Sequence, residues 1–144
     1  MAHRILVASD TSNITTLSFD SAAGSLEVSS DINVGHRPSW LTSHKSHPAV
    51  VFTGLQQSDG KVVALRYDEH GVGEAVSEAS SAGQEPCSLL ATQDEILIAN
   101  VRERFSALIM HPVNPCVIST DPGLSAFFPY LPLLGSPFPR RPFS

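Results

Sequence analysis

Three side chains that could bind an anionic small molecule stand close together in the segment NVGHRPSW, residues 33–40. They are His36, Arg37 and Trp40. A guanidinium and an imidazole can hold a carboxylate or phosphate through charge-assisted hydrogen bonds. In the commoner arrangement, such a His and Arg occupy a solvated turn and the Trp packs inside the fold. We therefore take His36, Arg37 and Trp40 as candidate substrate-binding residues.

Other reactive side chains give weaker signals. His44 and His47 have the spacing of a metal-binding pair, but no third ligand is evident, and we predict a polar turn at HKSHP. Cys87 directly follows Pro86, which favours a small core residue over a nucleophile. The chain contains no Gly-rich phosphate loop, nucleophile elbow or zinc signature. The sequence thus predicts no metal, and it identifies no catalytic residue.

Composition narrows the class of protein. A chain of 144 residues that is 42% hydrophobic is typical of one globular domain. The net charge of −5, without a Lys/Arg cluster, argues against nucleic acid. The apolar runs are too short for a membrane span, and the first residues do not resemble a signal peptide. We therefore expect a cytoplasmic protein with no membrane partner and with both cysteines reduced.

The motif around the candidate residues returns further along the chain. Gly35-His36-Arg37-Pro38 recurs as Gly83-Gln84-Glu85-Pro86, one 48-residue period later. At the same offset, ITTLSFD (14–20) aligns with VVALRYD (62–68) without a gap. The segments ILVAS (5–9), VVFTG (50–54) and LIAN (97–100) repeat with looser spacing. A period of this length is typical of propellers or helical arrays.

The repeat unit is composed of strands. VVALRYD alternates with a period of two, turn signals separate the short runs, and residues 1–100 show no helical period. One unit predicts four strands, at 39–43, 49–54, 61–68 and about 73–80, which describes a propeller blade. A small sandwich with two accidentally similar halves is the alternative, and the ungapped identities disfavour it. Because innermost strands line a propeller channel, residues beside Pro38 are well placed to meet a ligand.

The order of these segments resembles a known family. RILVAS, ITTLSFD, NVGHRPSWLTSH, DGKVVALRYDE and ILIAN follow one another as in the fungal branch of the seven-bladed β-propeller lactonases. That family includes 6-phosphogluconolactonase-like proteins and carboxy-cis,cis-muconate cyclases, and the resemblance covers about residues 3–100. It implies ring opening or closure on a carboxylated or phosphorylated lactone, with no redox cofactor. The catalytic His, Arg and Glu of the family come from later blades, so no residue of this chain inherits their roles.

Residues 101–144 differ from the rest of the chain. They hold eight of the eleven prolines, and no 48-residue repeat can be aligned with them. We predict a partial propeller over 1–100, followed by an irregular Pro-rich tail over 101–144 that is disordered or non-native, with little regular structure beyond about residue 105. A proline-rich ligand for an SH3-like groove, at 129–132 or 139–142, is the alternative for the tail.

The predicted propeller is incomplete. Residues 5–9 match the second strand of a blade, so the first blade lacks its innermost strand, and seven such blades would need about 336 residues. The sequence therefore predicts an all-β chain of about two four-stranded blades. We interpret it as a fragment of a lactonase-type enzyme that is inactive as it stands. A non-catalytic fragment that serves as a protein-interaction surface is the alternative, and the open blade edges could support self-association.

Overall fold

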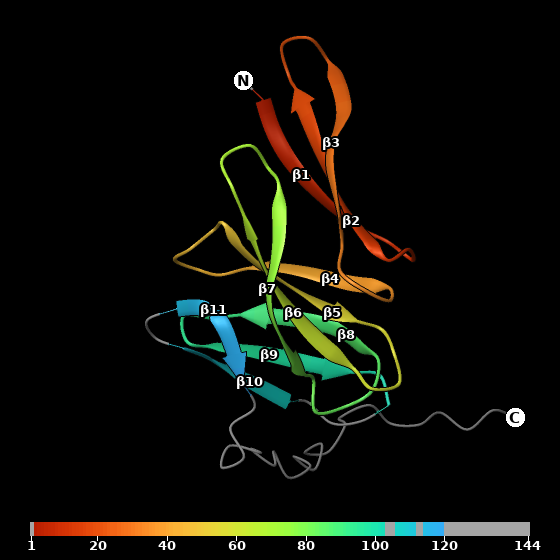
Figure 1. The fold of residues 1–144 in the computed structure, drawn as a ribbon, viewed down its shortest axis with the longest axis vertical. Helices are drawn as coiled ribbons and strands as arrows, with labels where there is room; N and C mark the ends of the chain where they lie inside the picture. The colour runs from red at the N-terminus through yellow and green to blue at the C-terminus, as the bar shows by residue number, and fades with distance from the viewer. Residues whose placement is uncertain (1, 103–105, 112–113, 120–144) are drawn as a thin grey trace, which may run out of the picture.

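The chain folds into three antiparallel sheets that follow one another in sequence (Figure 1). The computed structural model describes residues 2–102, 106–111 and 114–119. The first sheet contains β1 (Ala2–Ala8), β2 (Asn13–Asp20) and β3 (Ser25–Asn33). The second contains β4 (Pro38–Ser43), β5 (Val50–Leu55), β6 (Lys61–Tyr67) and β7 (Gly73–Ser80). The third contains β8 (Pro86–Ala91), β9 (Glu95–Asn100), β10 (Ser106–His111) and β11 (Asn114–Ser119). The predicted all-β partial propeller is confirmed.

The internal repeat is visible in the strand pairing. The register shifts between Thr16 and Leu17 in β2 and, at the matching place in the next copy, between Ala64 and Leu65 in β6. A second bulge follows Pro38 in β4, and its counterpart follows Pro86 in β8. Bulges that recur at matching positions show that the sheets are copies of one unit. The prediction that Pro38 and Pro86 occupy equivalent places is therefore confirmed.

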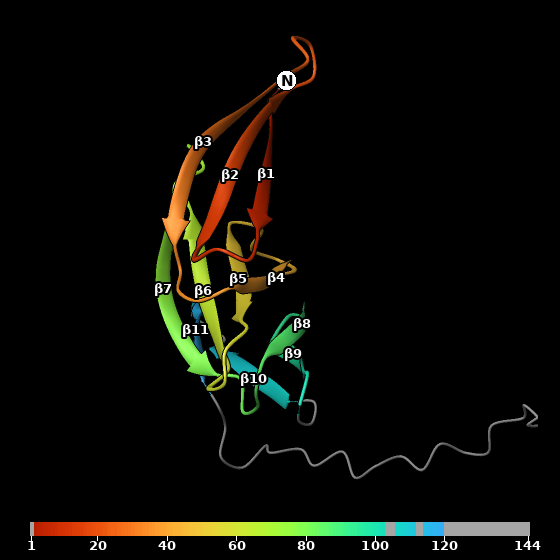
Figure 2. The same ribbon diagram turned by 90° about the vertical axis from the view of Figure 1, so that its right-hand side faces the viewer.

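The core consists of two apolar layers, one on each side of the second sheet. Val51 and Leu65 face the first sheet, where they pack in one cluster with Ile14. Phe52 faces the third sheet and packs in a second cluster that includes Ile98. Strand β5 is buried along its whole length because its two faces are covered by different neighbours. Figure 2 shows the three sheets following one another along the molecule.

Regular structure extends further than the sequence predicted. Strand β10 pairs with β9, and β11 pairs with β10, so the third sheet crosses the expected boundary at residue 100. The expectation of little regular structure beyond about residue 105 is wrong for residues 106–111 and 114–119. Pro115, which suggested an irregular tail, lies in the edge strand β11, where a missing N–H is tolerated. The rest of the tail, residues 120–144 with both PxxP segments, lies outside the described residues.

The first sheet has one strand fewer than the other two. Within the described chain, β1 pairs only with β2, whereas the corresponding strands β5 and β9 each have two partners. Among the described residues, β1 thus has no strand on its inner side, where the repeat gives β5 and β9 a second partner. None of the described residues belongs to a helix that could cross a membrane.

Candidate functional site

The turn that carries His36 and Arg37 is held by backbone hydrogen bonds from two other loops. It connects β3 to β4, and its backbone enters the left-handed region at Gly35 (φ 111°) and at Arg37 (φ 48°). The Arg37 N–H donates to the carbonyl of Thr11 at 3.1 Å, and the Gln56 N–H donates to the carbonyl of Arg37 at 3.0 Å. The turn is therefore fixed by main-chain contacts, which leave the Arg37 side chain to act independently.

The second copy of the motif builds the same backbone around Glu85. This residue also has a positive φ, of 54°, and it also precedes a proline. Its N–H donates to the carbonyl of Gln57 at 3.0 Å, and its carbonyl accepts from the Val101 N–H at 3.1 Å. The repeat thus reproduces the backbone of Arg37 at Glu85, with an acidic side chain in place of a basic one, whereas the positive φ of Gly35 has its counterpart at the neighbouring Ala82 and not at Gly83.

The guanidinium of Arg37 forms an ion pair on the molecular surface. Its Nη2 and Nε atoms lie 3.0 and 3.2 Å from Oδ1 of Asp10. The Arg37 side chain is 45% exposed and the Asp10 side chain 86% exposed. An exposed pair of this kind contributes only about 0–1 kcal/mol. An anionic ligand could therefore compete with Asp10 for the guanidinium.

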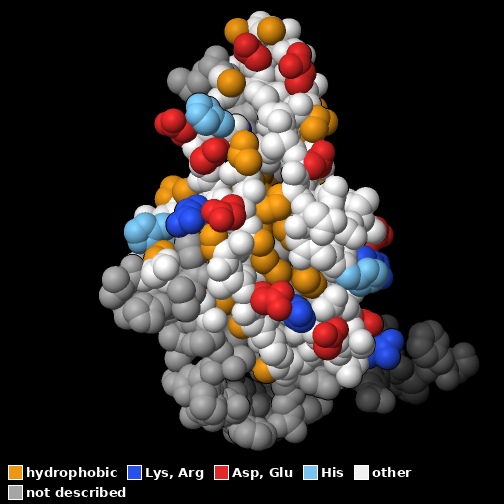
Figure 3. Space-filling model, viewed as in Figure 1, with side chains coloured by type: hydrophobic (Ala, Val, Ile, Leu, Met, Phe, Trp, Pro, Cys, Tyr) orange, Lys and Arg blue, Asp and Glu red, His pale blue; other side chains and the backbone are white. Residues whose placement is uncertain are grey.

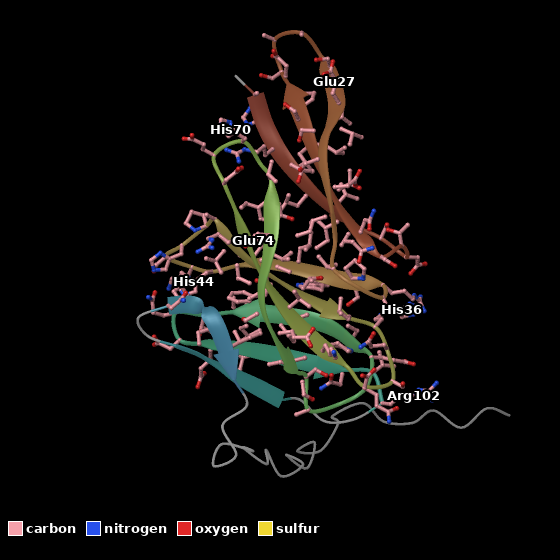
Figure 4. All side chains as sticks on the ribbon, in the orientation of Figure 1. Glu27, His36, His44, His70, Glu74 and Arg102 are labelled. Carbon is pink, nitrogen blue, oxygen red and sulfur yellow. The ribbon has the colours of Figure 1, made fainter. Side chains whose placement is uncertain are left out.

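His36 directly precedes this arginine in the sequence, and Trp40 follows it three residues later. His36 is exposed in the turn, on the side of the molecule that also carries Arg102 (Figure 4). Trp40 lies in β4 just after the bulge and is 45% exposed, so it does not pack inside the fold. The three predicted residues thus occupy one short, exposed segment at the start of β4.

The inner strands β4 and β8 are joined beside this segment. The Ser39 hydroxyl lies 2.7 Å from the carbonyl oxygen of Pro86 and 3.1 Å from that of Gly54. Cys87 is the counterpart of Ser39 in the repeat, and its half-buried thiol lies 3.4 Å from the carbonyl oxygen of Ala99. This contact agrees with the expectation of a structural cysteine rather than a nucleophile.

His44 and His47 form the polar turn that the sequence predicted. The buried His44 ring accepts hydrogen bonds at Nδ1 from the N–H groups of Ser46 and His47, each at 3.1 Å. Nε2 therefore carries the proton and donates to the carbonyl of Gln93 in the third sheet, at 3.0 Å. Both ring nitrogens are engaged, so His44 serves packing between the sheets. Among the described residues, no group of three His, Cys, Asp or Glu side chains is placed to hold a metal ion.

A cleft that the sequence did not predict lies between the first and second sheets. It has a volume of about 430 Å³, and its lining includes Arg4 and Leu6 of β1 together with Tyr67 at the end of β6. Burial raises the pKa of the Tyr67 hydroxyl, and the nearby Thr16 hydroxyl opposes part of this shift. The Tyr67 and Thr16 oxygens do not form a hydrogen bond with good geometry. Tyr67 aligns with Phe19 in the repeat, so its sequence position indicated only a core residue.

The fold, the repeat and the comparisons with known proteins identify the family. The sequence model described as "Lactonase, 7-bladed beta-propeller" matches residues 4–119. The chain therefore belongs to the seven-bladed β-propeller lactonase family. The match includes β10 and β11, which lie within the predicted tail. None of the curated proteins matches the chain.

Solved structures with the same fold include two bacterial proteins described as putative 6-phosphogluconolactonases. The one from Bacteroides fragilis has a TM-score of 0.71 and 21% identity, and the match covers 78% of this chain and 33% of that protein. The one from Bacteroides uniformis has a TM-score of 0.71 and 20% identity, and the match covers 78% and 35%. A periplasmic gluconolactonase from Pseudomonas aeruginosa has a TM-score of 0.67 and 18% identity, covering 82% and 37%. The chain thus spans about a third of the length of these structures.

Proposed function

We propose that this chain is part of a lactonase-type propeller whose ligand is a carboxylated or phosphorylated lactone. Hydrolysis of 6-phosphogluconolactone and cyclisation of carboxymuconate are the two reactions that fit such a ligand. Membership of the lactonase family supports the proposal. The observation that carries it is the exposed Arg37 guanidinium, which extends from a turn fixed by main-chain hydrogen bonds, in the same short segment as His36 and Trp40, and whose exposed partner Asp10 an anion could displace.

The residues at this turn suit anchoring of the substrate better than bond cleavage. In lactone hydrolysis, water adds to the carbonyl carbon, the ring C–O bond breaks, and the departing ring oxygen takes up a proton. That sequence needs a general base and donors that stabilise the negative oxygen of the intermediate. Arg37 and His36 offer charge and hydrogen bonds to a phosphate or carboxylate, and Trp40 offers an apolar surface for the sugar ring.

We infer that the 144-residue chain binds such an anion weakly and does not turn over a lactone. Catalysis depends on groups held around the substrate from several sides, and poor positioning removes many powers of ten in rate. The described residues supply three sheets, and the family has seven blades. A channel wall built by three sheets faces solvent on its other side.

Binding can be tested directly because Trp40 is the only tryptophan of the chain. Titration with 6-phosphogluconate should change the fluorescence of Trp40, whereas neutral glucose should not. Arg37→Ala should weaken binding at least about tenfold, which corresponds to the loss of one charge-assisted contact. Arg66→Ala is the matched control, because Arg66 is also exposed and paired, with Glu74, but lies in β6 away from the turn. Equal responses of the two variants would refute the assignment of this site.

Activity is tested separately with two assays. One follows hydrolysis of 6-phosphogluconolactone above its spontaneous rate, and the other follows cyclisation of 3-carboxymuconate by ultraviolet absorbance. We expect neither reaction to be accelerated by this chain. Saturable turnover that His36→Ala or Arg37→Ala abolishes would overturn the inactive-fragment interpretation and make those residues part of a working active site.

A non-catalytic role as an interaction surface is the second candidate function. It is favoured by the exposed apolar side chains on the two outermost sheet faces, which include Val28 and Leu90. Binding of 6-phosphogluconate at Trp40 would favour the lactonase origin, and its absence together with a defined partner would favour the interaction role.

A further inference from the structure

The second sheet packs against a neighbouring sheet on both of its faces, whereas the first and third sheets each pack on one face only among the described residues. Each sheet turns one face toward the next sheet in sequence, which we call its leading face, and the opposite, trailing face toward the previous one. Phe52 lies on the leading face of the second sheet, where it packs against the third sheet and is fully buried. Val51 lies on the trailing face, packs against the first sheet and is 6% exposed.

The third sheet has a leading face that no described residue covers. The repeat places Leu90 and Leu97 at the positions that Thr42 and Phe52 occupy in the second sheet, and both pairs are opposite one another across two strands. Leu90 is 60% exposed and Leu97 is 41% exposed. Leu97, the counterpart of a fully buried phenylalanine, thus lies at the surface.

The first sheet has the complementary trailing face, also uncovered by described residues. Ile5 pairs with Leu17, and Leu17 pairs with Val28, so the three side chains form one row across the sheet. Ile5 and Leu17 correspond to Val51 and Leu65, which are buried in the second sheet. Ile5 is 43% exposed and Val28 is 63% exposed. Figure 3 shows hydrophobic side chains reaching the surface over the first sheet.

We propose that two copies of this chain associate head to tail, with the leading face of the third sheet of one copy against the trailing face of the first sheet of the other. The chain already contains this kind of contact twice. The leading face of the first sheet packs on the trailing face of the second, and the leading face of the second packs on the trailing face of the third. The exposed side chains argued above are apolar on both faces, with Glu95 beside Leu97 on the same face of β9, and contiguous exposed apolar patches are typical of interaction sites. A second copy carries the complement of each uncovered face.

The geometry of the family limits the assembly to two copies. A head-to-tail contact can in general continue into rings or filaments. Two copies supply six sheets of a ring that closes with seven blades, and a third copy would need room for three more. The contact therefore ends in a dimer with a gap one blade wide.

The test is sedimentation velocity of the full 144-residue chain between about 1 and 100 µM, a range that covers micromolar association. We expect a species of twice the chain mass of 15.4 kDa. Leu97→Lys and Ile5→Lys should each raise the dissociation constant at least about a hundredfold, because each buries an unpaired charge in the contact. Val72→Lys is the matched control, since Val72 is 55% exposed in the turn between β6 and β7 and lies on neither face.

Mixing the two monomeric variants separates this arrangement from every symmetric one. Leu97→Lys retains an intact trailing face and Ile5→Lys retains an intact leading face, so an equimolar mixture should regain the dimer. If Leu97→Lys or Ile5→Lys melts at a lower temperature than the wild type, Leu90→Lys and Val28→Lys provide a second pair of variants at more exposed positions. A monomeric wild-type chain would overturn the proposal. Larger polymers, or a mixture that stays monomeric, would overturn it equally.

Discussion

Replacement of Phe52 by Ala tests the packing of the second sheet on the third. Phe52 is fully buried between Thr42 of β4 and Ala64 of β6, its cross-strand neighbours. Neither neighbour is large enough to fill the space of a lost phenyl ring, so the substitution leaves a cavity beside Ile98. Phe→Ala changes in such sites cost about 3–5 kcal/mol. A domain of this size has a total stability of only about 5–15 kcal/mol, so the loss should be large in proportion.

Urea denaturation followed by far-ultraviolet circular dichroism measures this cost. We expect Phe52→Ala to lower the unfolding midpoint strongly, and Phe52→Leu to cost less than about 1.5 kcal/mol because it keeps most of the volume. Val72→Ala, at an exposed turn position, should stay within about 0.5 kcal/mol of the wild type. A cost below about 1 kcal/mol for Phe52→Ala would show that the second and third sheets do not pack through this residue, and the assignment of leading and trailing faces would fail.

Three further predictions follow from individual contacts. His44→Ala should cost about 2–4 kcal/mol in urea denaturation, because it removes the bond to Gln93 and leaves two backbone N–H groups without their acceptor, whereas the exposed His47→Ala should change little. Hydrogen bonds from backbone N–H groups, that of Val72 above all, lower the pKa of the Asp68 carboxyl from its ordinary value of 3.8. The ionised carboxylate therefore stabilises the fold above pH 3.8, and this stabilisation is lost as the pH falls through the pKa of Asp68 in the folded protein. Asp68→Asn should therefore weaken the acid dependence of the melting temperature, and an unchanged slope would contradict the assignment. Burial raises the pKa of Tyr67 above 10.0, so stability should fall as the pH rises past 10.0, and Tyr67→Phe should reduce that fall in alkaline melting curves.

Most of the fold could be predicted from the sequence because its signals are local and repeated. The expected strands at 39–43, 49–54, 61–68 and about 73–80 agree with β4 to β7 within one residue at each end. Alternation of apolar residues marks the strands, and Gly-x-x-Pro marks each entry into an inner strand. A signal that occurs twice at a fixed distance is stronger than either copy alone, which is why the internal repeat placed Pro38 and Pro86 correctly.

Strands β10 and β11 were not predicted because the high proline content of residues 101–144 was given more weight than their apolar runs. Residues 106–111 and 114–119 contain the apolar runs of ordinary strands, but the prolines around them indicated an irregular tail. Proline excludes a strand from the middle of a sheet and not from its edge, and β11 is an edge strand among the described residues. The position of a strand within its sheet is a tertiary property, and the local sequence does not state it.

The sequence predicted which segment carries the candidate site, but it did not predict the contacts and exposure of the side chains in that segment. The sequence placed His36, Arg37 and Trp40 at the start of an inner strand, where the structure has them. It could not show that Asp10, in the turn between β1 and β2, pairs with Arg37, because that contact depends on how two sheets meet. It also could not show that Trp40 is exposed, since the bulge after Pro38 decides where the side chain lies.

Arg37 and Glu85 show how this fold separates scaffold from chemistry. Both residues have a left-handed backbone, which costs a non-glycine residue about 1–2 kcal/mol, and both are held by two main-chain hydrogen bonds that do not involve their side chains. The backbone is therefore the same with arginine and with glutamate at this position, and the two copies carry opposite charges. One pairs with Asp10 and the other lies 3.7 Å from Arg102. The two copies thus present different side chains from one structural position, and in the proposed site it is Arg37, not Glu85, that could hold an anion.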